Sequence, residues 1–404
     1  MLFVGIDWAE DHHDICILDE SGDVLRRRRI EDGLSGLETL QALLAEFAAD
    51  PTQVIVGIET DRGLLVRGLL ASDYEVYAIN PKAVSRYRDR HAVSGAKSDA
   101  GDAKVLADLV RTDRHNHRPI QGDSELTDAV KVLARAHRSL IWTRQRQANQ
   151  LRHLLREFYP GAIAAFGSDL TSTDALALLM AAPTPIRGRT LSQAQIGSAL
   201  RRAGRQRQIE ARAAQIQAAL RQPQLQAPAR VADAYGATVA ATVPILLELN
   251  AQIAHLEQEL KKAFEEHPDA EIYQSLPGLG IVLGGRVLAE FGDDRTRFQH
   301  AKARKNYAGT APITKASGKS RIVLARVARN RHLADACYLW AFSSITRSPG
   351  ARRYYTALRQ RGKTHPQALR SLANRLVGIV HGCLAHRQRF NEAVAWPSAA
   401  TLAA

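Results

Sequence analysis

The stretch Val54-Ile55-Val56-Gly57-Ile58-Glu59 decides the fold of this 404-residue chain. Five residues without a polar side chain stand in a row, which predicts a central strand buried on both faces. A single acid, Glu59, closes the run. The elements on either side of this strand determine which kind of sheet it belongs to.

Three short strands are predicted upstream, at residues 2–8, 14–19 and 24–30, and the second and third are joined by a hairpin turn. A helix is expected over 33–48. Downstream, a helix over 64–71 and a strand over 74–79 precede a further helix that opens near residue 98. The order βββ-α-β-α-β-α indicates an α/β fold with a mixed sheet and helices on its faces, which is the ribonuclease-H-like layout.

Four acids occupy the ends of these elements. Asp7 ends the first strand, Glu59 ends the central strand, and Asp99 and Asp102 lie at the start of the last helix. Residues three apart share a helix face, and two like charges held that close repel unless a cation lies between them. Oxygen ligands suit Mg²⁺, so the four acids predict a Mg²⁺ site for phosphodiester chemistry. Asp99 by itself also fits a first-turn residue that the helix dipole favours.

The pair His12-His13 is the one dense histidine pair, and a surface turn explains it better than a metal site. The three cysteines are far apart in the sequence and indicate neither a metal site nor a disulfide framework, which fits a protein of the reducing cytosol. Acidic residues interrupt the N-terminal apolar run, so no signal peptide is expected, and no membrane span is expected either.

The formal net charge is +14, and the cations are clustered. A merely soluble surface is one explanation, but clustering favours a polyanionic partner. Residues 82–98 form a basic segment that we expect to be a loop. A long helix over 127–158 carries arginines and lacks acids between 129 and 156, which favours a phosphate-facing helix over a solvated one. The candidate nucleic-acid ligands here are Arg86, Arg88, Arg90, Lys97, Arg138, Arg144 and Arg152.

The remainder divides into a linker, a C-terminal domain and a tail. Residues 160–235 are rich in Ala, Gln and Arg and predict helices with little tertiary information. Residues 243–264 carry an apolar helical seam, which fits an intramolecular contact or a coiled coil between protomers. The predicted domains are 1–158, a helical and coiled-coil linker over 159–268, a mostly α-helical domain over 269–395 and a disordered tail from 396.

Two features of the C-terminal domain carry chemistry. Helices flank the turn at Gly278 and Gly280, and such helix-hairpin-helix elements offer backbone N–H groups to a phosphate. Ser317 lies in a glycine loop among cations, where a hydroxyl could attack a phosphodiester. A turn serine whose neighbours bind the nucleic-acid backbone is the simpler explanation, and Ser320 is a possible substitute. The cations concerned are Lys315, Lys319 and Arg321.

The sequence resembles the DEDD transposases of the insertion-sequence-110 class, the bridge-RNA-guided recombinases, over nearly its whole length. The N-terminal part is similar to their RuvC-like domain through residues 5–7, 58–60 and 97–103. The C-terminal part is similar to their second domain. The matching segments there are 276–280, Arg297-Phe298, 307–309 and Ser317-Gly318.

The resemblance implies Mg²⁺ bound by Asp7, Glu59, Asp99 and Asp102, and a serine nucleophile that motif position assigns to Ser317. It implies a composite site in which the carboxylates of one protomer meet the serine of another, hence a dimer or tetramer. It also implies a structured non-coding RNA, a donor DNA and a target DNA as partners, in the cytoplasm with the nucleoid. The long middle segment, rich in Ala, Gln and Arg, makes this chain longer than the compact members of that family.

Two alternatives stay open at this point. A RuvC-like junction nuclease would hydrolyse DNA with metal-activated water and would need no serine, but the whole third domain exceeds what such an enzyme requires. A non-catalytic nucleic-acid scaffold is the other, and it would gain nothing from four converging acids in a basic protein.

Overall fold

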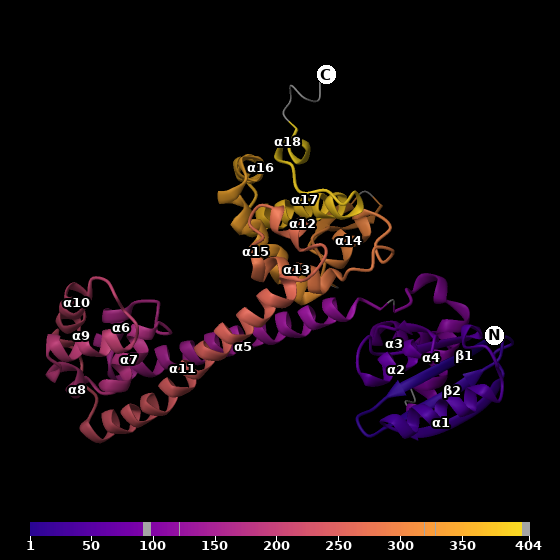
Figure 1. Ribbon diagram of the computed structural model, residues 1–404, viewed down its shortest axis with the longest axis horizontal. Coiled ribbons are helices and arrows are strands. Elements are labelled where there is room, and N and C mark those ends of the chain that lie inside the picture. Colours follow the sequence, from indigo (N-terminus) through magenta and orange to yellow (C-terminus); the bar gives the residue numbers. More distant parts are fainter. Residues whose placement is uncertain (92–97, 121, 319, 328, 398–404) are drawn as a thin grey trace. The chain divides into compact units, whose positions relative to one another are not determined.

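The computed structural model describes residues 1–91, 98–120, 122–318, 320–327 and 329–397. Two compact units make up the chain, Met1–Gly122 and Asp123–Ala404. The first unit corresponds to the α/β part of the sequence, and the second is mainly helical (Figure 1). The long helix that we grouped with the first domain lies in the second unit, and the three-domain division stays a prediction.

The first unit contains a five-stranded sheet in the order β3-β2-β1-β4-β5. Strand β1 pairs antiparallel with β2 and parallel with β4, so the predicted mixed sheet is confirmed. The central strand predicted from 54–59 is β4, which is buried along its whole length. The strands are β1 Leu2–Trp8, β2 His12–Leu18, β3 Val24–Glu31, β4 Val54–Ile58 and β5 Glu75–Ala78.

Helices cover both faces of this sheet. Side chains at even positions of β1 pack against α1 (Leu34–Ala45) and α2 (Leu64–Ala71). Odd positions pack against α3 (Pro81–His91) and α4 (Asp99–Thr112). The loop expected over 82–98 is therefore wrong as far as residue 91, because Pro81 starts a helix and the Asn80 side chain accepts a hydrogen bond from the Lys82 backbone N–H at 2.9 Å.

Two glycines let α4 lie directly on the sheet. A Cβ atom at Gly5 would overlap the carbonyl oxygen of Ala103 and lie 2.5 Å from the backbone nitrogen of Ala107. A Cβ atom at Gly57 would lie 2.8 Å from the carbonyl oxygen of Leu106. Each glycine stands two residues before an acid, Asp7 or Glu59. The contact therefore fixes the start of α4 relative to the ends of β1 and β4.

The second unit is organised by a pair of long helices, α5 (Glu125–Phe158) and α11 (Ala229–Glu265), which run side by side (Figure 1). At one end they share a core with α6 Pro160–Phe166, α7 Thr173–Ala181, α9 Gln193–Arg202 and α10 Ile209–Arg221, and α8 Pro185–Thr190 packs against α10. The expectation of little tertiary information in this region is wrong, because Leu176, Leu200 and Ile216 are fully or almost fully buried there.

Helix α11 is long and apolar enough to cross a membrane by length and composition alone. Core helices of soluble proteins pass the same test, and Val239, Val243 and Leu246 of α11 are buried in the helical core. The apolar composition of α11 is therefore explained in part by packing inside the unit.

A second core joins the other end of the α5–α11 pair to the C-terminal elements. Trp340 is fully buried there, and its indole N–H donates to the carbonyl of Pro277 at 3.0 Å. The helices are α12 Ala270–Ser275, α13 Ile281–Phe291, α14 Ala301–Tyr307, α15 Arg331–Arg347, α16 Pro349–Gln360, α17 His365–Ala385 and α18 Glu392–Ala395. Strands β6 (Ile313–Ser317) and β7 (Ser320–Leu324) form a hairpin.

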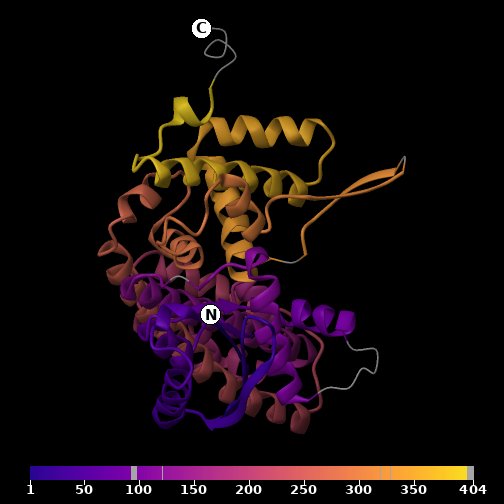
Figure 2. The same cartoon turned by 90° about the vertical axis from the view of Figure 1, so that its right-hand side faces the viewer.

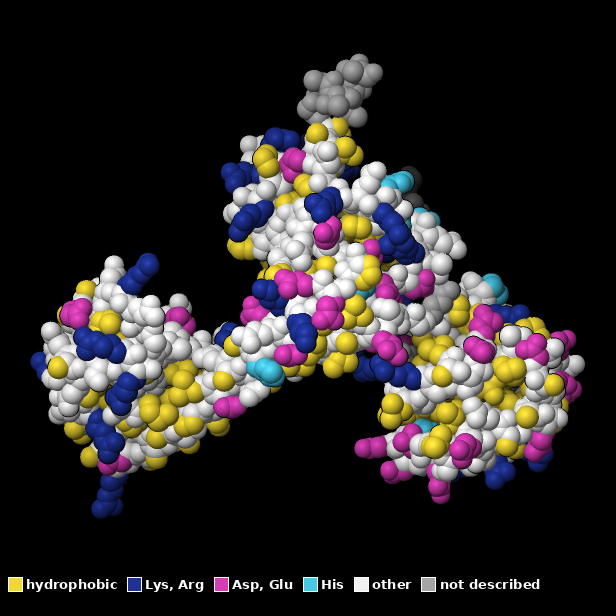
Figure 3. Space-filling view, viewed as in Figure 1, with side chains coloured by type: hydrophobic (Ala, Val, Ile, Leu, Met, Phe, Trp, Pro, Cys, Tyr) yellow, Lys and Arg dark blue, Asp and Glu magenta, His cyan; other side chains and the backbone are white. Residues whose placement is uncertain are grey.

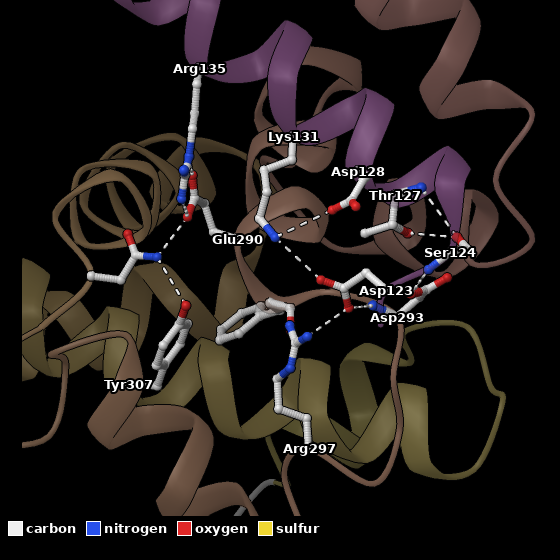
Figure 4. A network of polar contacts seen from close by, with 12 residues as sticks. Asp123, Ser124, Thr127, Asp128, Lys131, Arg135, Glu290, Asp293, Arg297 and Tyr307 are labelled. Carbon is white, nitrogen blue, oxygen red and sulfur yellow. Dashed lines mark hydrogen bonds and ion pairs between the residues drawn. The ribbon is translucent and has the colours of Figure 1, made fainter. Parts of the chain in front are cut away.

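A polar network ties the start of α5 to the end of α13 (Figure 4). Glu290 is buried and accepts two hydrogen bonds from Arg135, at 2.8 and 2.9 Å, and one from Asn330 at 2.6 Å. Burial acts to raise the pKa of Glu290, but the bonds from Arg135 and Asn330 outweigh it and hold the pKa below its ordinary value. Arg297 pairs with Asp123 at 3.0 Å, so this motif arginine has a packing role.

We expect Gly5→Ala to destabilise the first unit, because the added methyl group overlaps backbone atoms of α4. Overpacking of this kind costs about 1–3 kcal/mol or more. Thermal and urea unfolding of the full chain would measure the loss. Gly122→Ala is the matched control, since a Cβ atom at Gly122 meets no heavy atom within 4 Å. Equal stability of the two variants would contradict the close contact.

Glu290→Gln should lower the free energy of unfolding at pH 7 by about 3 kcal/mol, because it leaves Arg135 without its buried carboxylate. The folded-state pKa of Glu290 lies below its ordinary value of 4.5. The stabilisation by the carboxylate is therefore complete above that value and is lost as the pH falls through the folded-state pKa.

Urea unfolding at pH 7 and at lower pH should show the gap between wild type and Glu290→Gln shrinking on acidification. Glu271→Gln is the control, since the Glu271–Arg389 ion pair is exposed and such pairs contribute little. A gap that stays constant with pH would remove Glu290 from this role.

Candidate active-site residues

The predicted acids Asp7 and Glu59 belong to the sheet face covered by α4. Phe3 of β1 and Ile55 of β4 pack in the core with α4, and Asp7 and Glu59 stand four residues further along each strand direction. The two strands are parallel with Ile6 opposite Ile58, so the acids that follow these residues end neighbouring strands at the same edge. Both acids are half-buried.

Helix α4 brings the other two predicted acids to its first turn. Ser98 caps the helix, and its hydroxyl accepts a hydrogen bond from the Gly101 backbone N–H at 3.2 Å. Asp99 is exposed, with 61% of its side chain accessible, whereas the Asp102 side chain is only 6% accessible. The helix pattern predicted both positions, but not this difference in burial.

Arg88 of α3 forms an ion pair with Asp102. The guanidinium is itself mostly buried, at 21% side-chain exposure, so a cation compensates the burial of this carboxylate. We predicted Arg88 to contact nucleic acid, and the structure places it against Asp102 instead. Arg86 and Arg90 of the same helix are exposed, and Lys97 lies outside the described residues.

A second arginine joins two acids on the same sheet face. Arg29 of β3 binds Asp14 of β2 through two hydrogen bonds, at 2.7 and 3.3 Å. The Arg29 guanidinium also lies 3.6 Å from an Asp99 oxygen. Asp14 stands opposite Asp7 in the β1–β2 ladder, and paired residues of antiparallel strands share a face. Asp14 therefore adds a carboxylate that our sequence analysis missed.

His12, Asp14 and Asp99 could hold a metal ion. One ligand atom of each lies within 4.8 Å of the others. The interpretation of His12-His13 as a surface turn is wrong, because both residues belong to β2 and His13 is fully buried, 3.0 Å from Asp32. The spacing His-x-Asp, which puts both side chains on one strand face, was the signal in the sequence.

The donor set fits a divalent cation. Carboxylates suit Mg²⁺ and Mn²⁺, and imidazole extends the range toward softer metals. Asp7, Glu59 and Asp102 are not members of the group formed by His12, Asp14 and Asp99. The convergence of the four originally predicted acids on one ion stays a prediction.

Ser317 and Ser320 lie in the second unit, at the tip of the β6–β7 hairpin, where they pair with each other. Both are exposed, as are Lys315 and Arg321, and Lys319 lies outside the described residues. Figure 2 shows the hairpin projecting from the helices that carry it. Gly318 supplies the turn with φ of +55°.

A cavity of about 300 Å³ lies where the hairpin joins the helices. Arg329, Arg331 and Arg370 line it, together with Gly309 and Thr310 of the predicted motif at 307–311. One acid, Asp335, also lines the cavity, and it pairs with Arg138 and Arg286. Cations therefore accumulate at the base of the serine hairpin, although no sequence pattern links the three arginines.

The turn between α12 and α13 packs against α15. Gly278 has φ of +83°, and a Cβ atom there would lie 2.7 Å from the backbone nitrogen of Ser344. Gly280 precedes α13, and a Cβ atom at this position would meet no heavy atom within 4 Å. Gly278 is thus explained by packing, and Gly280 faces open space at the start of a helix.

The three predicted phosphate ligands on α5 bind protein groups. Arg138 pairs with Asp335 at 3.0 Å and lies over the ring of Trp142. Arg144 donates to the side chain of Asn250 at 2.9 Å, and Arg152 donates to the carbonyl of Gly167 at 2.7 Å. Each arginine therefore has a packing role in this structure.

Comparisons with known proteins agree on one kind of relative. Residues 4–160 match a family model described as transposase, of the IS110 type with a DEDD motif, and residues 270–356 match the transposase IS116/IS110/IS902 family. A mini-circle protein of Streptomyces coelicolor, described as a candidate transposase for IS117, is 46% identical over 97% of this chain and 95% of its own length.

Two further relatives come from insertion elements. An uncharacterised 42 kDa protein of IS900 from Mycobacterium paratuberculosis is 29% identical over 100% of this chain and 99% of its own length. An uncharacterised 44.8 kDa protein of IS116 from Streptomyces clavuligerus is 29% identical over 97% of this chain and 96% of its own length.

We expect Asp14→Asn and His12→Ala each to weaken Mn²⁺ binding by the full chain about tenfold, because each removes a donor from the group around Asp99. Electron paramagnetic resonance of free Mn²⁺ would measure the affinity without reference to activity. Glu38→Gln is the control, since Glu38 is an exposed acid on α1, which covers the opposite face of the sheet. Unchanged affinity in both site variants would exclude His12 and Asp14 as ligands.

Proposed function

Because the chain belongs to the IS110-type transposase family, we propose that it cleaves and rejoins DNA through a carboxylate metal site and a C-terminal serine nucleophile. The family implies a DNA-processing role and a divalent metal. The observation that carries the finer proposal is the pairing of two unlike sites in one chain. The first unit gathers acids beside the start of α4, and the second presents a serine among cations.

We propose Mg²⁺ as the metal, held by Asp7, Glu59, Asp99 and Asp102, with His12 and Asp14 beside them. Bound Mg²⁺ would act as a Lewis acid on phosphate oxygens. The protein's own contribution is to hold the acids on one sheet face, where Arg29 and Arg88 offset part of their repulsion. When a divalent cation binds these acids, Arg29 and Arg88 would release Asp99 and Asp102.

Ser317 is the proposed nucleophile. Its Oγ would form a bond to the phosphorus of a DNA phosphodiester as the DNA oxygen leaves, which gives a phosphoserine ester. Lys315 and Arg321 on the same hairpin would balance the charge that develops on the phosphate oxygens. Among the described residues, no hydrogen bond to a basic side chain prepares the Ser317 hydroxyl, so we propose that its proton acceptor comes from another part of the assembly.

This requirement supports a composite site. We propose that the serine hairpin of one protomer meets the acids of another within a dimer or tetramer. Helix α11 offers a surface for such assembly, since Val231 and Ile245 share one side of the helix and are exposed, at 44% and 52%. Figure 3 shows hydrophobic side chains gathered along this flank of the helix pair. The apolar seam predicted over 243–264 packs largely inside the unit, since Ile253, Leu260 and Phe264 are buried, and only Ile245 of that seam belongs to the exposed surface.

The proposed nucleic-acid partners are a donor DNA, a target DNA and a structured non-coding RNA. The net charge of +14 supports a polyanionic partner of this size. Exposed Arg86 and Arg90 on α3, Lys315 and Arg321 on the hairpin, and Gly280 at the start of α13 are the best placed of the predicted contacts. We place the protein in the cytoplasm, with the nucleoid.

The alternative is a junction nuclease of the RuvC type, which would use the acids and metal-activated water alone. Only the serine mechanism predicts a covalent protein–DNA adduct. The test is denaturing electrophoresis of the protein after incubation with labelled element-end DNA, RNA and Mg²⁺, followed by mapping of the labelled residue.

Ser317→Ala should abolish the adduct and leave nucleic-acid binding intact, whereas Ser320→Ala should keep it. Asp102→Asn should reduce cleavage at least about a hundredfold, because it removes a charged group from the metal-holding half. Cleavage by Ser317→Ala at the wild-type rate would overturn the serine mechanism and favour the nuclease. An adduct that maps to Ser320 would move the nucleophile by three residues.

A further inference from the structure

A larger cavity lies in the second unit between α14, α17 and the segment after α17. Its volume is about 660 Å³, within the range of small-molecule sites. Lys305 of α14, Arg375 and Ile379 of α17, and Phe390 line it. None of the features assigned above, the acids or the serine hairpin, lies in this cavity.

Two glycines of α17 create the space. Gly378 and Gly382 stand one turn apart on the helix face that lines the cavity. A Cβ atom at Gly378 would lie 2.9 Å from Cε and 3.0 Å from Nζ of Lys305, so the lysine side chain lies in the room that this glycine leaves. A Cβ atom at Gly382 would meet no heavy atom within 4 Å. Glycine weakens a helix interior, so both positions lower helix stability. Gly378 leaves room for the Lys305 side chain, and Gly382 leaves open space in the cavity.

The cavity has several basic side chains. Lys305, Arg375, His386 and Arg389 line it, and the described lining contains no acidic side chain. Arg389 pairs with Glu271 at 2.6 Å, and Arg375 donates to the carbonyl of Ala395 at 3.0 Å. The ammonium group of Lys305 has no hydrogen bond or ion pair with any described residue. A partly buried ammonium group beside a guanidinium lacks the anion that would balance both charges.

Among the described residues, no acidic side chain offsets the charge of Lys305. Burial lowers the pKa of Lys305, and Arg375 lowers it further. Burial also lowers the pKa of the neighbouring His381, as do the charges of Arg304, His300 and Lys305. A bound anion would reverse the electrostatic part of each effect. The cavity is therefore built to receive negative charge.

The cavity also has apolar side chains. Phe390, Ile379 and Val394 line it, and the Phe390 backbone N–H is fixed by a hydrogen bond of 2.8 Å to Ser275. An inorganic anion would need only the cations, whereas a nucleotide combines a phosphate with a flat apolar base. Single-stranded nucleic acids are bound by just this combination of cations and stacking side chains.

We propose that this cavity binds one unstacked nucleotide of a nucleic-acid strand, with its phosphate on Lys305 and Arg375 and its base against Ile379 and Phe390. The site rests on the proposed function in one respect, that nucleic acid is the partner. Contacts between the cations and a phosphate do not depend on the base sequence, so the cavity would recognise the shape of an unpaired nucleotide.

The test uses the full chain and a hairpin oligonucleotide with one bulged nucleotide, made as RNA and as DNA, against the same hairpin without the bulge. Lys305→Gln removes the charge, and Gly382→Leu fills the cavity where there is open space. Lys302→Gln is the matched control, because Lys302 is exposed on the same helix and does not line the cavity. Thermal unfolding midpoints check that each variant folds.

We expect Lys305→Gln and Gly382→Leu each to weaken binding of the bulged probe about tenfold and to leave the unbulged probe unchanged. Lys305→Gln should also reduce the slope of affinity against salt by about one. Photocrosslinking from 5-iodouridine at the bulge should map to the segment around Phe390. The bulge should increase affinity more in one of the two hairpins, RNA or DNA, and that hairpin identifies the nucleic acid that supplies the nucleotide.

Equal binding of the bulged probe by wild type, Lys305→Gln and Gly382→Leu would overturn the site while leaving nucleic-acid binding by the protein in place. A wild-type protein that binds neither hairpin would overturn the proposed function and this site together. The two failures are therefore distinguishable.

Discussion

The close contact between α4 and the sheet is the constraint on which the candidate active site depends. At Gly5 and Gly57 the helix backbone lies where any side chain would overlap it or crowd it. A helix held this close to two neighbouring parallel strands has little freedom to slide. Because each glycine stands two residues before an acid, the same contact determines where Asp7 and Glu59 lie relative to the first turn of α4. The geometry of the acids thus follows from the absence of two side chains.

Bringing acids together on one sheet face creates a repulsion that the fold must offset. The structure does so with guanidinium groups, Arg88 on Asp102 and Arg29 on both Asp14 and Asp99. An arginine neutralises one charge and cannot be deprotonated in a protein, whereas a divalent cation can neutralise two charges at shorter distances. The arginines therefore compensate part of the negative charge of these acids, and they leave a donor set that a divalent ion can use.

Periodicity was enough to predict the strands, a sheet of mixed parallel and antiparallel pairing, and the helix at 64–71, whose bounds the structure reproduces. Periodicity failed at residues 82–91, where the many basic side chains suggested a loop. The signal for a helix there is local, since Asn80 and Pro81 start α3. Periodicity also failed at His12 and Asp14, because their role depends on the register between β1 and β2 and on Arg29 from a third strand. The helices after residue 160 bury many small side chains, which give weak apolar periodicity even though the core is well packed.

The exposure of Ser317 has a chemical consequence that reaches beyond the hairpin. A serine hydroxyl is a weak nucleophile until a base takes its proton, and the described hairpin offers cations, which stabilise a phosphate but accept no proton. The acids of the first unit have the opposite capacity, since they can hold a metal or accept a proton but include no serine. Each half lacks what the other has, and a DNA phosphate could contact both, the cations directly and the acids through a bound divalent cation. In the proposed mechanism the DNA strand therefore connects the two halves of the active site, with its phosphate beside the cations of the hairpin and beside the metal ion that the acids would hold.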